Sequence, residues 1–148
     1  MIKINIQRAT KKPYLPSNKR IREWVHKALT GRIHQAELNI RVVDTREASH
    51  LNRKWRGKIG ATNVLSFPAN GLKDIVPGFL GDIVLCAPVI AREAMQQGKS
   101  PDAHWAHMII HGTLHLMGYD HIKPAEARKM ERLEKKLLAR LAFGDPYK

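Results

Sequence analysis

Alternating apolar and polar residues predict four β-strands. The clearest case is the N-terminus, where polar residues separate Ile2, Ile4 and Ile6, because a period of two is typical of a half-buried strand. Pro68 closes the third run, and the fourth run is apolar enough to be more deeply buried. The predicted strands cover about residues 2–7, 36–43, 62–68 and 80–86.

Apolar residues at spacings of three and four predict five helices. Ser17 can cap the first helix and Asp44 or Thr45 the second, while Gly31 can end the first. The fourth helix is apolar around most of its circumference and should be largely buried, and the charges of the fifth are interpreted as a solvated face. The predicted helices cover about residues 18–29, 45–55, 88–97, 101–117 and 124–141.

Length and composition predict one globular domain spanning residues 1–148. The chain is 43% hydrophobic, which is ordinary for such a domain. It has neither a signal-peptide apolar region nor a run of apolar residues long enough for a membrane span, so we expect a cytoplasmic protein without a membrane partner. The single cysteine, Cys86, lies in an apolar run and should pack in the core. Residues 69–79 contain two glycines and a proline and predict a surface loop.

Charge points to a polyanionic partner. There are 26 Lys and Arg residues against 13 Asp and Glu residues, which gives a formal charge of +13. Nucleic acid is the first partner to consider, although solubility or nonspecific attraction would also account for basic charge. Four of the cations and Trp55 fall within residues 53–58. This segment is either a phosphate-contacting edge or the solvated end of a helix.

The stretch of greatest chemical interest places three histidines as H-x3-H-x5-H. His111 and His115 should stand one turn apart on one helix face, and Gly118 can turn the chain so that His121 arrives from a third direction. Imidazole nitrogen suits zinc, and three protein ligands leave a fourth position open, as in catalytic zinc sites. The pKa of a water bound there would fall towards about 7.

This spacing also occurs in the metzincin protease signature, with one departure. The proteases place a glutamate general base where this chain has Gly112. A protease is therefore disfavoured, and we expect the glycine to leave room beside the metal for a tetrahedral group such as a phosphodiester.

Three further residues are weaker candidates for the site. His104 and His107 fall on the same helical stripe as His111 and could be donors around the metal, substrate contacts or ordinary packing residues. Asp82 begins the fourth strand, where it could orient a water or a ligand histidine, or could simply cap a turn.

Together these motifs resemble the YbeY family of bacterial endoribonucleases and ribosomal RNA maturation factors. The resemblance rests on residues 111–121, which read H-G-x-L-H-L-x-G-Y-D-H, and on R-G-K, T-N-V-L-S-F-P and L-G-D-I segments in the same order before them. It implies an α+β fold, a single zincin-like domain with a mixed four-stranded sheet and about five helices. It also implies one zinc ion per chain, held by His111, His115 and His121, and a functional arginine at Arg56.

The implied function is cleavage of single-stranded RNA. The family's work is on the 3′ end of small-subunit (16S) ribosomal RNA and in ribosome quality control, so ribosomal RNA and the small ribosomal subunit are the expected partners, and DNA is not. Arg56 is expected to stabilise charge on the phosphate oxygens, with Asp82 as a candidate base. The alternative is a zinc-stabilised RNA-binding ribosome-assembly factor without chemistry of its own.

Overall fold

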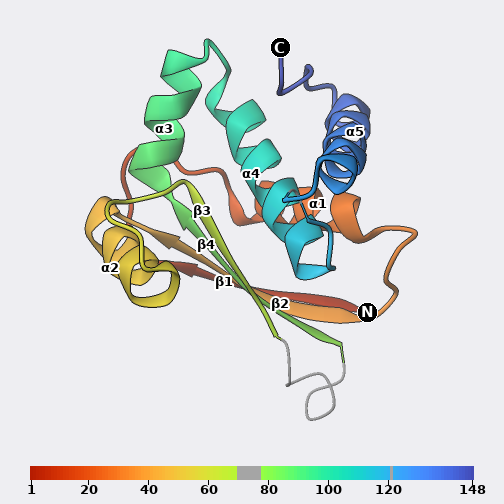
Figure 1. Cartoon of the computed structure of the whole chain (residues 1–148), viewed down its shortest axis with the longest axis horizontal. Coiled ribbons are helices and arrows are strands. Elements are labelled where there is room, and N and C mark those ends of the chain that lie inside the picture. The colour runs from red at the N-terminus through yellow and green to blue at the C-terminus, as the bar shows by residue number, and fades with distance from the viewer. Residues whose placement is uncertain (70–77, 121) are drawn as a thin grey trace.

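The computed structural model describes residues 1–69, 78–120 and 122–148, and its centre is a four-stranded mixed sheet. The strand order is β1-β2-β4-β3. The first three strands in this order run parallel, whereas β3 pairs antiparallel with β4 and lies at the edge (Figure 1). The strands are β1 (Ile2–Arg8), β2 (Ala36–Val43), β3 (Val64–Pro68) and β4 (Phe79–Cys86).

Within the described residues, five helices pack around this sheet, as predicted. Side chains of Ser17, Asp44 and Ser100 accept hydrogen bonds from backbone N–H groups in the first turns of three of them, which explains where these helices begin. In Figure 1, α1, α4 and α5 lie above the sheet and α2 lies at its left. The helices are α1 (Asn18–Leu29), α2 (Thr45–Arg56), α3 (Ala87–Gln96), α4 (Pro101–Leu116) and α5 (Pro124–Arg140).

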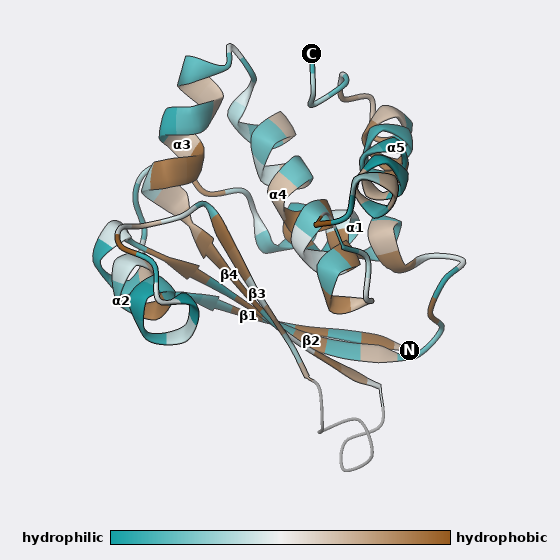
Figure 2. Cartoon of the chain, viewed as in Figure 1, coloured by the Kyte–Doolittle hydropathy of each residue, from teal (hydrophilic) through white to brown (hydrophobic). Residues whose placement is uncertain are grey.

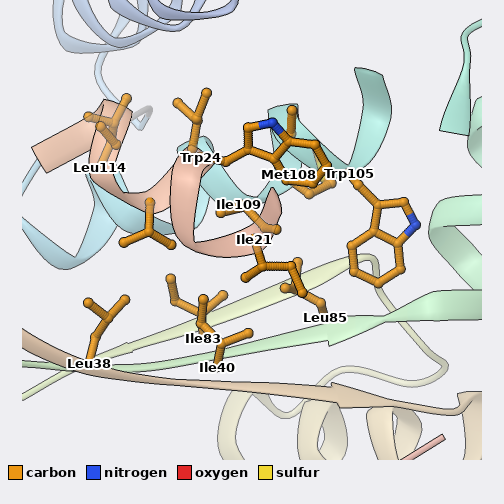
Figure 3. Close-up of a cluster of buried hydrophobic side chains, with 14 of the residues drawn as sticks. Ile21, Trp24, Leu38, Ile40, Ile83, Leu85, Trp105, Met108, Ile109 and Leu114 are labelled. Atoms are coloured by element: carbon orange, nitrogen blue, oxygen red, sulfur yellow. The ribbon is translucent and has the colours of Figure 1, made fainter. Parts of the chain in front are cut away.

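Alternation along the strands separates two apolar cores. Ile83 and Leu85 of β4 pack in the main core with α1 and α4 (Figure 3), while Val84 and Cys86 pack in a smaller core with α2. Cys86 is only 1% exposed, which confirms its predicted place in the core. The hydropathy colouring shows brown residues concentrated where helices meet the sheet and teal residues along the outer side of α5 (Figure 2). The two faces of β4 therefore pack against different helices.

A glycine brings the edge strand close to its neighbour. Gly81 has a φ of 133°, and a Cβ atom there would lie 2.2 Å from the carbonyl oxygen of Phe67 on β3. A residue with a side chain would clash with that backbone atom, so the close approach of β3 to β4 depends on Gly81. The edge strand positioned in this way forms one wall of the site described below.

Two further sequence predictions concern a surface loop and membrane spans. Most of the surface loop predicted at residues 69–79 lies outside the described residues, because the description omits 70–77. Within the described part of the chain, no helix is both long and apolar enough to cross a membrane.

Candidate metal centre

A column of histidines runs along α4. His104, His107, His111 and His115 succeed one another at spacings of three or four residues, and neighbouring ring centroids lie 6.2, 6.2 and 4.8 Å apart. The shortest of these distances joins His111 and His115. The prediction that these two rings stand together on one helix face is confirmed.

Glu134 on α5 faces this column from inside the protein. Its side chain is fully buried, and its Oε2 accepts a hydrogen bond from Nδ1 of His111 at 2.6 Å. Its Oε1 lies 3.1 Å from Nε2 of His107 and also accepts a bond from the phenol of Tyr147. Both carboxylate oxygens are thus engaged, which offsets the cost of removing a charge from water.

These contacts set the protonation states around Glu134. Burial alone would raise the pKa of the carboxyl group, but the hydrogen bonds from His107, His111 and Tyr147 outweigh burial and lower it to about 2. Burial and the adjacent carboxylate raise the pKa of the Tyr147 phenol far above its ordinary value. Because an ionised carboxylate only accepts, His111 must donate from Nδ1, and Nε2 is then the nitrogen of this ring that could coordinate a metal ion.

The same residues form a group that could hold a metal ion. Ligand atoms of His107, His111 and Glu134 all lie within 4.8 Å of one another. His104 is held separately, because its Nε2 lies 2.8 Å from Oε1 of Glu93, and burial lowers the pKa of this histidine. Of the two weak histidine candidates, His107 therefore belongs to the immediate surroundings of His111 and His104 does not.

His111 and His115 also open onto a pocket of about 670 Å³. The pocket lies along the edge strand β3, between the C-terminal ends of α2 and α4. Arg56, at the end of α2, donates from Nη2 to the carbonyl oxygen of Ser66 at 2.6 Å, and its guanidinium carbon lies 5.7 Å from the Phe67 ring centroid. The lining residues are Asn52, Arg56, Lys58, Thr62, Asn63, Val64, Leu65, Ser66, Pro68, His111, His115, Gly118, Tyr119, Asp120 and Ile122.

The third predicted ligand, His121, lies outside the described residues. The turn that precedes it is as predicted: Gly118 has a φ of 99° and donates its N–H to the carbonyl oxygen of His115 at 3.0 Å. Its neighbours Asp120 and Ile122 both line the pocket.

The structure does not bring Asp82 to this pocket. Strand alternation places its side chain on the face of Val84 and Cys86, opposite the Ile83 face that packs against α4. There Oδ1 of Asp82 accepts a hydrogen bond from Asn39 at 2.9 Å. The expectation of a carboxylate near the metal cleft fails because Asp82 and Ile83, being adjacent in a strand, point to opposite faces.

Gly112 serves a different purpose from the predicted one. A Cβ atom on this residue would meet Ile83 at 3.0 Å and Ser66 at 3.2 Å, so the glycine faces the sheet rather than the space beside His111. The expectation that it leaves room for a phosphodiester is wrong. Gly112 instead allows α4 to pack closely on β3 and β4, which brings its histidines to the edge strand.

Sequence patterns alone do not single out Glu134 or Tyr147 as residues of this site. The prediction that the charges of the last helix form a solvated face is wrong for Glu134, which lies four residues after Met130 and three before Leu137, both of which are buried. A carboxylate on the apolar stripe of an amphipathic helix was the available signal. Nothing comparable marks Tyr147, which reaches Glu134 only through the path of the C-terminal segment.

The fold and the site together define a mixed α+β protein whose histidine-bearing helix opens onto a basic pocket at a sheet edge. Residues 5–142 match the family model described as Endoribonuclease YbeY. The chain therefore belongs to the endoribonuclease YbeY family.

Individual relatives agree with this assignment along nearly their whole length. The chain is 52% identical to the endoribonuclease YbeY of Xanthomonas campestris pv. campestris strain B100, with 97% of this chain and 92% of the relative covered. It is 51% identical to that of Pseudomonas syringae pv. tomato, with 99% and 89% covered. The solution structure of TM1509 from Thermotoga maritima has the same fold, with a TM-score of 0.61 over 100% of this chain and 99% of that one, at 24% identity.

Proposed function

We propose that this chain is a zinc-dependent endoribonuclease that cuts single-stranded RNA. The observation that carries the proposal is the meeting of His111, His115 and Arg56 in one pocket of an endoribonuclease YbeY family member. We further propose that residues 1–148 form one domain of this kind, which acts in the bacterial cytoplasm. Its work is maturation of the 3′ end of 16S ribosomal RNA on the small subunit, and ribosome quality control.

We assign one zinc ion per chain to His111, His115 and His121. The donors fit this metal, because the bond from Nδ1 of His111 to Glu134 directs Nε2 towards coordination, and His115 lines the same pocket. The turn at Gly118 carries the chain back along the pocket towards residue 121. A zinc ion held there supplies Lewis acidity towards a phosphodiester and lowers the pKa of a coordinated water towards about 7.

In this proposal Glu134 acts through His111 and is not itself a ligand. The 2.6 Å between Nδ1 of His111 and Oε2 of Glu134 is a hydrogen-bond distance. Two ligand atoms on a tetrahedral zinc ion, each about 2.0–2.1 Å from the metal, stand roughly 3.3 Å apart. A carboxylate behind a ligand histidine fixes the tautomer and the ring orientation.

We assign to Arg56 the role of contacting the phosphate group of the RNA that is cut. Its guanidinium is held at the pocket wall by the carbonyl oxygen of Ser66 and by the ring of Phe67. A fixed guanidinium can stabilise the negative charge that develops on the nonbridging oxygens during hydrolysis. Asp82 lies on the other face of the sheet and has no role in this mechanism.

The test combines metal content with cleavage of a labelled single-stranded RNA, for the native chain and for His115→Ala. We expect one zinc per chain in the native protein, and loss of both metal and cleavage in a variant whose circular dichroism is unchanged. Equal cleavage by the metal-depleted variant would indicate a contaminating nuclease.

The rival function is that of a zinc-stabilised ribosome-assembly factor that binds RNA without cutting it. In that case removal of the metal should lower stability and RNA affinity together, because structural zinc binding is coupled to folding. The enzyme should instead lose cleavage while it keeps most of its RNA affinity.

A further inference from the structure

Trp55 differs from the other two tryptophans of the chain in being exposed. Trp24 and Trp105 are 3% and 1% exposed, whereas Trp55 is 61% exposed at the last turn of α2. A single exposed apolar residue is ordinary on a protein surface. Trp55, however, precedes the pocket residue Arg56. Of two further exposed apolar residues, Ile122 lines the pocket and Ile59 follows its lining residue Lys58.

The indole is held in place although it is exposed. Its ring packs edge-on against Phe67, with centroids 6.5 Å apart and an interplanar angle of 69°. Phe67 in turn lies under the guanidinium of Arg56. Of these three side chains only Arg56 lines the pocket, and its contact with Phe67 connects it to Trp55. An aromatic surface fixed in this way can accept a planar ligand with little loss of entropy.

The positive charge around Trp55 favours a planar ligand that carries negative charge. Arg53, Lys54, Arg56 and Lys58 fall within six residues of sequence, and the last two line the pocket. The ammonium of Lys54 lies 5.2 Å from the indole centroid. A ligand with both negative charge and exposed flat rings is complementary to this surface. Single-stranded RNA has both, whereas duplex RNA keeps its bases stacked on one another.

We propose that Trp55 is a stacking platform for an unpaired base of the RNA whose backbone enters the pocket beside Arg56. This proposal rests on the proposed function, because it assigns a base-binding position next to the phosphate that the site would cut. Trp55 contributes affinity for unpaired segments and takes no part in the chemistry. It accounts for a preference for single strands, since a base in a duplex is not available to the indole.

The first experiment measures binding of a labelled single-stranded RNA by fluorescence anisotropy in a chelator, so that the RNA stays intact. Trp55→Ala should weaken binding roughly 5- to 150-fold, the range typical of one base–aromatic stack. Trp55→Phe should recover much of that loss, because phenylalanine still presents an aromatic face. Met95→Ala is the matched control, since Met95 is an exposed apolar residue on α3 that does not line the pocket.

The salt dependence of binding separates stacking from charge. Trp55→Ala should leave the slope of log K against log salt unchanged, because no phosphate contact is removed, whereas Lys54→Gln should reduce it by up to about 1. With a duplex RNA of the same sequence, Trp55→Ala should have little effect. Equal weakening of duplex and single-strand binding, or single-strand binding that matches the native chain, would overturn the proposal.

Failure of this inference is distinguishable from failure of the proposed function. If the native chain binds and cuts RNA, and Trp55→Ala does both equally well, the platform is refuted while the nuclease stands. If Trp55→Ala loses affinity for single strands but the metal-loaded native chain cuts nothing, the platform stands and the nuclease fails. Circular dichroism of each variant excludes unfolding as the cause.

Discussion

At the scale of single residues, Glu134 has the contacts that a charged side chain needs in order to be buried. Its oxygens accept from two histidines and a phenol, and this arrangement explains why a carboxylate occupies the apolar stripe of α5. The bond to Nδ1 of His111 is the contact with a consequence for metal binding, because it decides which imidazole nitrogen can coordinate.

Glu134→Gln is predicted to weaken zinc binding about 10- to 100-fold without removing the site. The glutamine carbonyl can still accept from His111, but the charge that increases the basicity of the imidazole is lost. A metal-competition titration measures this change, with circular dichroism as the check on folding. The matched control is His107→Ala, which should retain one zinc per chain.

The opposite pattern would identify different ligands. If His107→Ala loses the metal while His115→Ala retains it, then His107, His111 and Glu134 are the ligands, and the assignment to His111, His115 and His121 is wrong.

Arg56→Ala is predicted to lower kcat/KM for RNA cleavage by about 10² to 10³, by analogy with the loss of one electrostatic contact to a transition state. Arg46→Ala is the matched control, because Arg46 is an exposed arginine in the first turn of the same helix. Single-turnover kinetics at saturating RNA separates this effect from weaker binding. Unchanged cleavage by Arg56→Ala together with abolished cleavage by Arg46→Ala would contradict the role given to Arg56.

At the scale of elements, the site depends on how closely β3, β4 and α4 pack. Gly81 lets the edge strand approach β4, and Gly112 lets α4 approach both strands. These two glycines therefore set the distance between Ser66 on the strand and the histidines on the helix. A pocket between a strand edge and a helix end cannot form if either approach is lengthened.

Gly81→Ala is predicted to destabilise the fold by about 3 kcal/mol or more, because its Cβ atom would meet a backbone oxygen in a conformation that side chains rarely adopt. Gly31→Ala is the matched control, since Gly31 also has a positive φ but has open space around it. That change should cost only about 1 kcal/mol. Urea unfolding of the two variants measures the difference, and equal costs would show that the close approach is unimportant.

At the scale of the whole molecule, net charge determines how the protein meets its substrate. A formal charge of +13 attracts RNA from a distance, but the pocket cations alone can be aligned with the scissile region. Attraction of this kind is screened by salt, whereas the base stacking proposed for Trp55 involves no charge pair and should depend on salt much less.

RNA binding is predicted to weaken steeply with salt and to survive removal of the metal. If the four cations of residues 53–58 each contact a phosphate of a single strand, the slope of log K against log salt is about −3. Titrations at several salt concentrations, with and without a chelator, measure this slope. A slope near zero, or affinity that disappears with the metal in a folded protein, would contradict the model.

The sequence by itself determined the elements and the first part of the site. Four strands and five helices were predicted within a few residues of their observed bounds, since periodicity and capping act over one or two turns of chain. The pairing of His111 with His115 followed from the same local geometry. Arg56 was found through the family resemblance, and its place in the pocket agrees with that expectation.

Only the tertiary structure decided what faces the histidines. Glu134 and Tyr147 contact His107 although they lie 27 and 40 positions after it in the sequence. The side chain of Asp82 points to the opposite face of the sheet. Gly112 faces the sheet and does not leave space beside a metal ion. The physical reason is that such contacts depend on how whole elements pack against one another, and the periodicity of a single element carries no information about its partner.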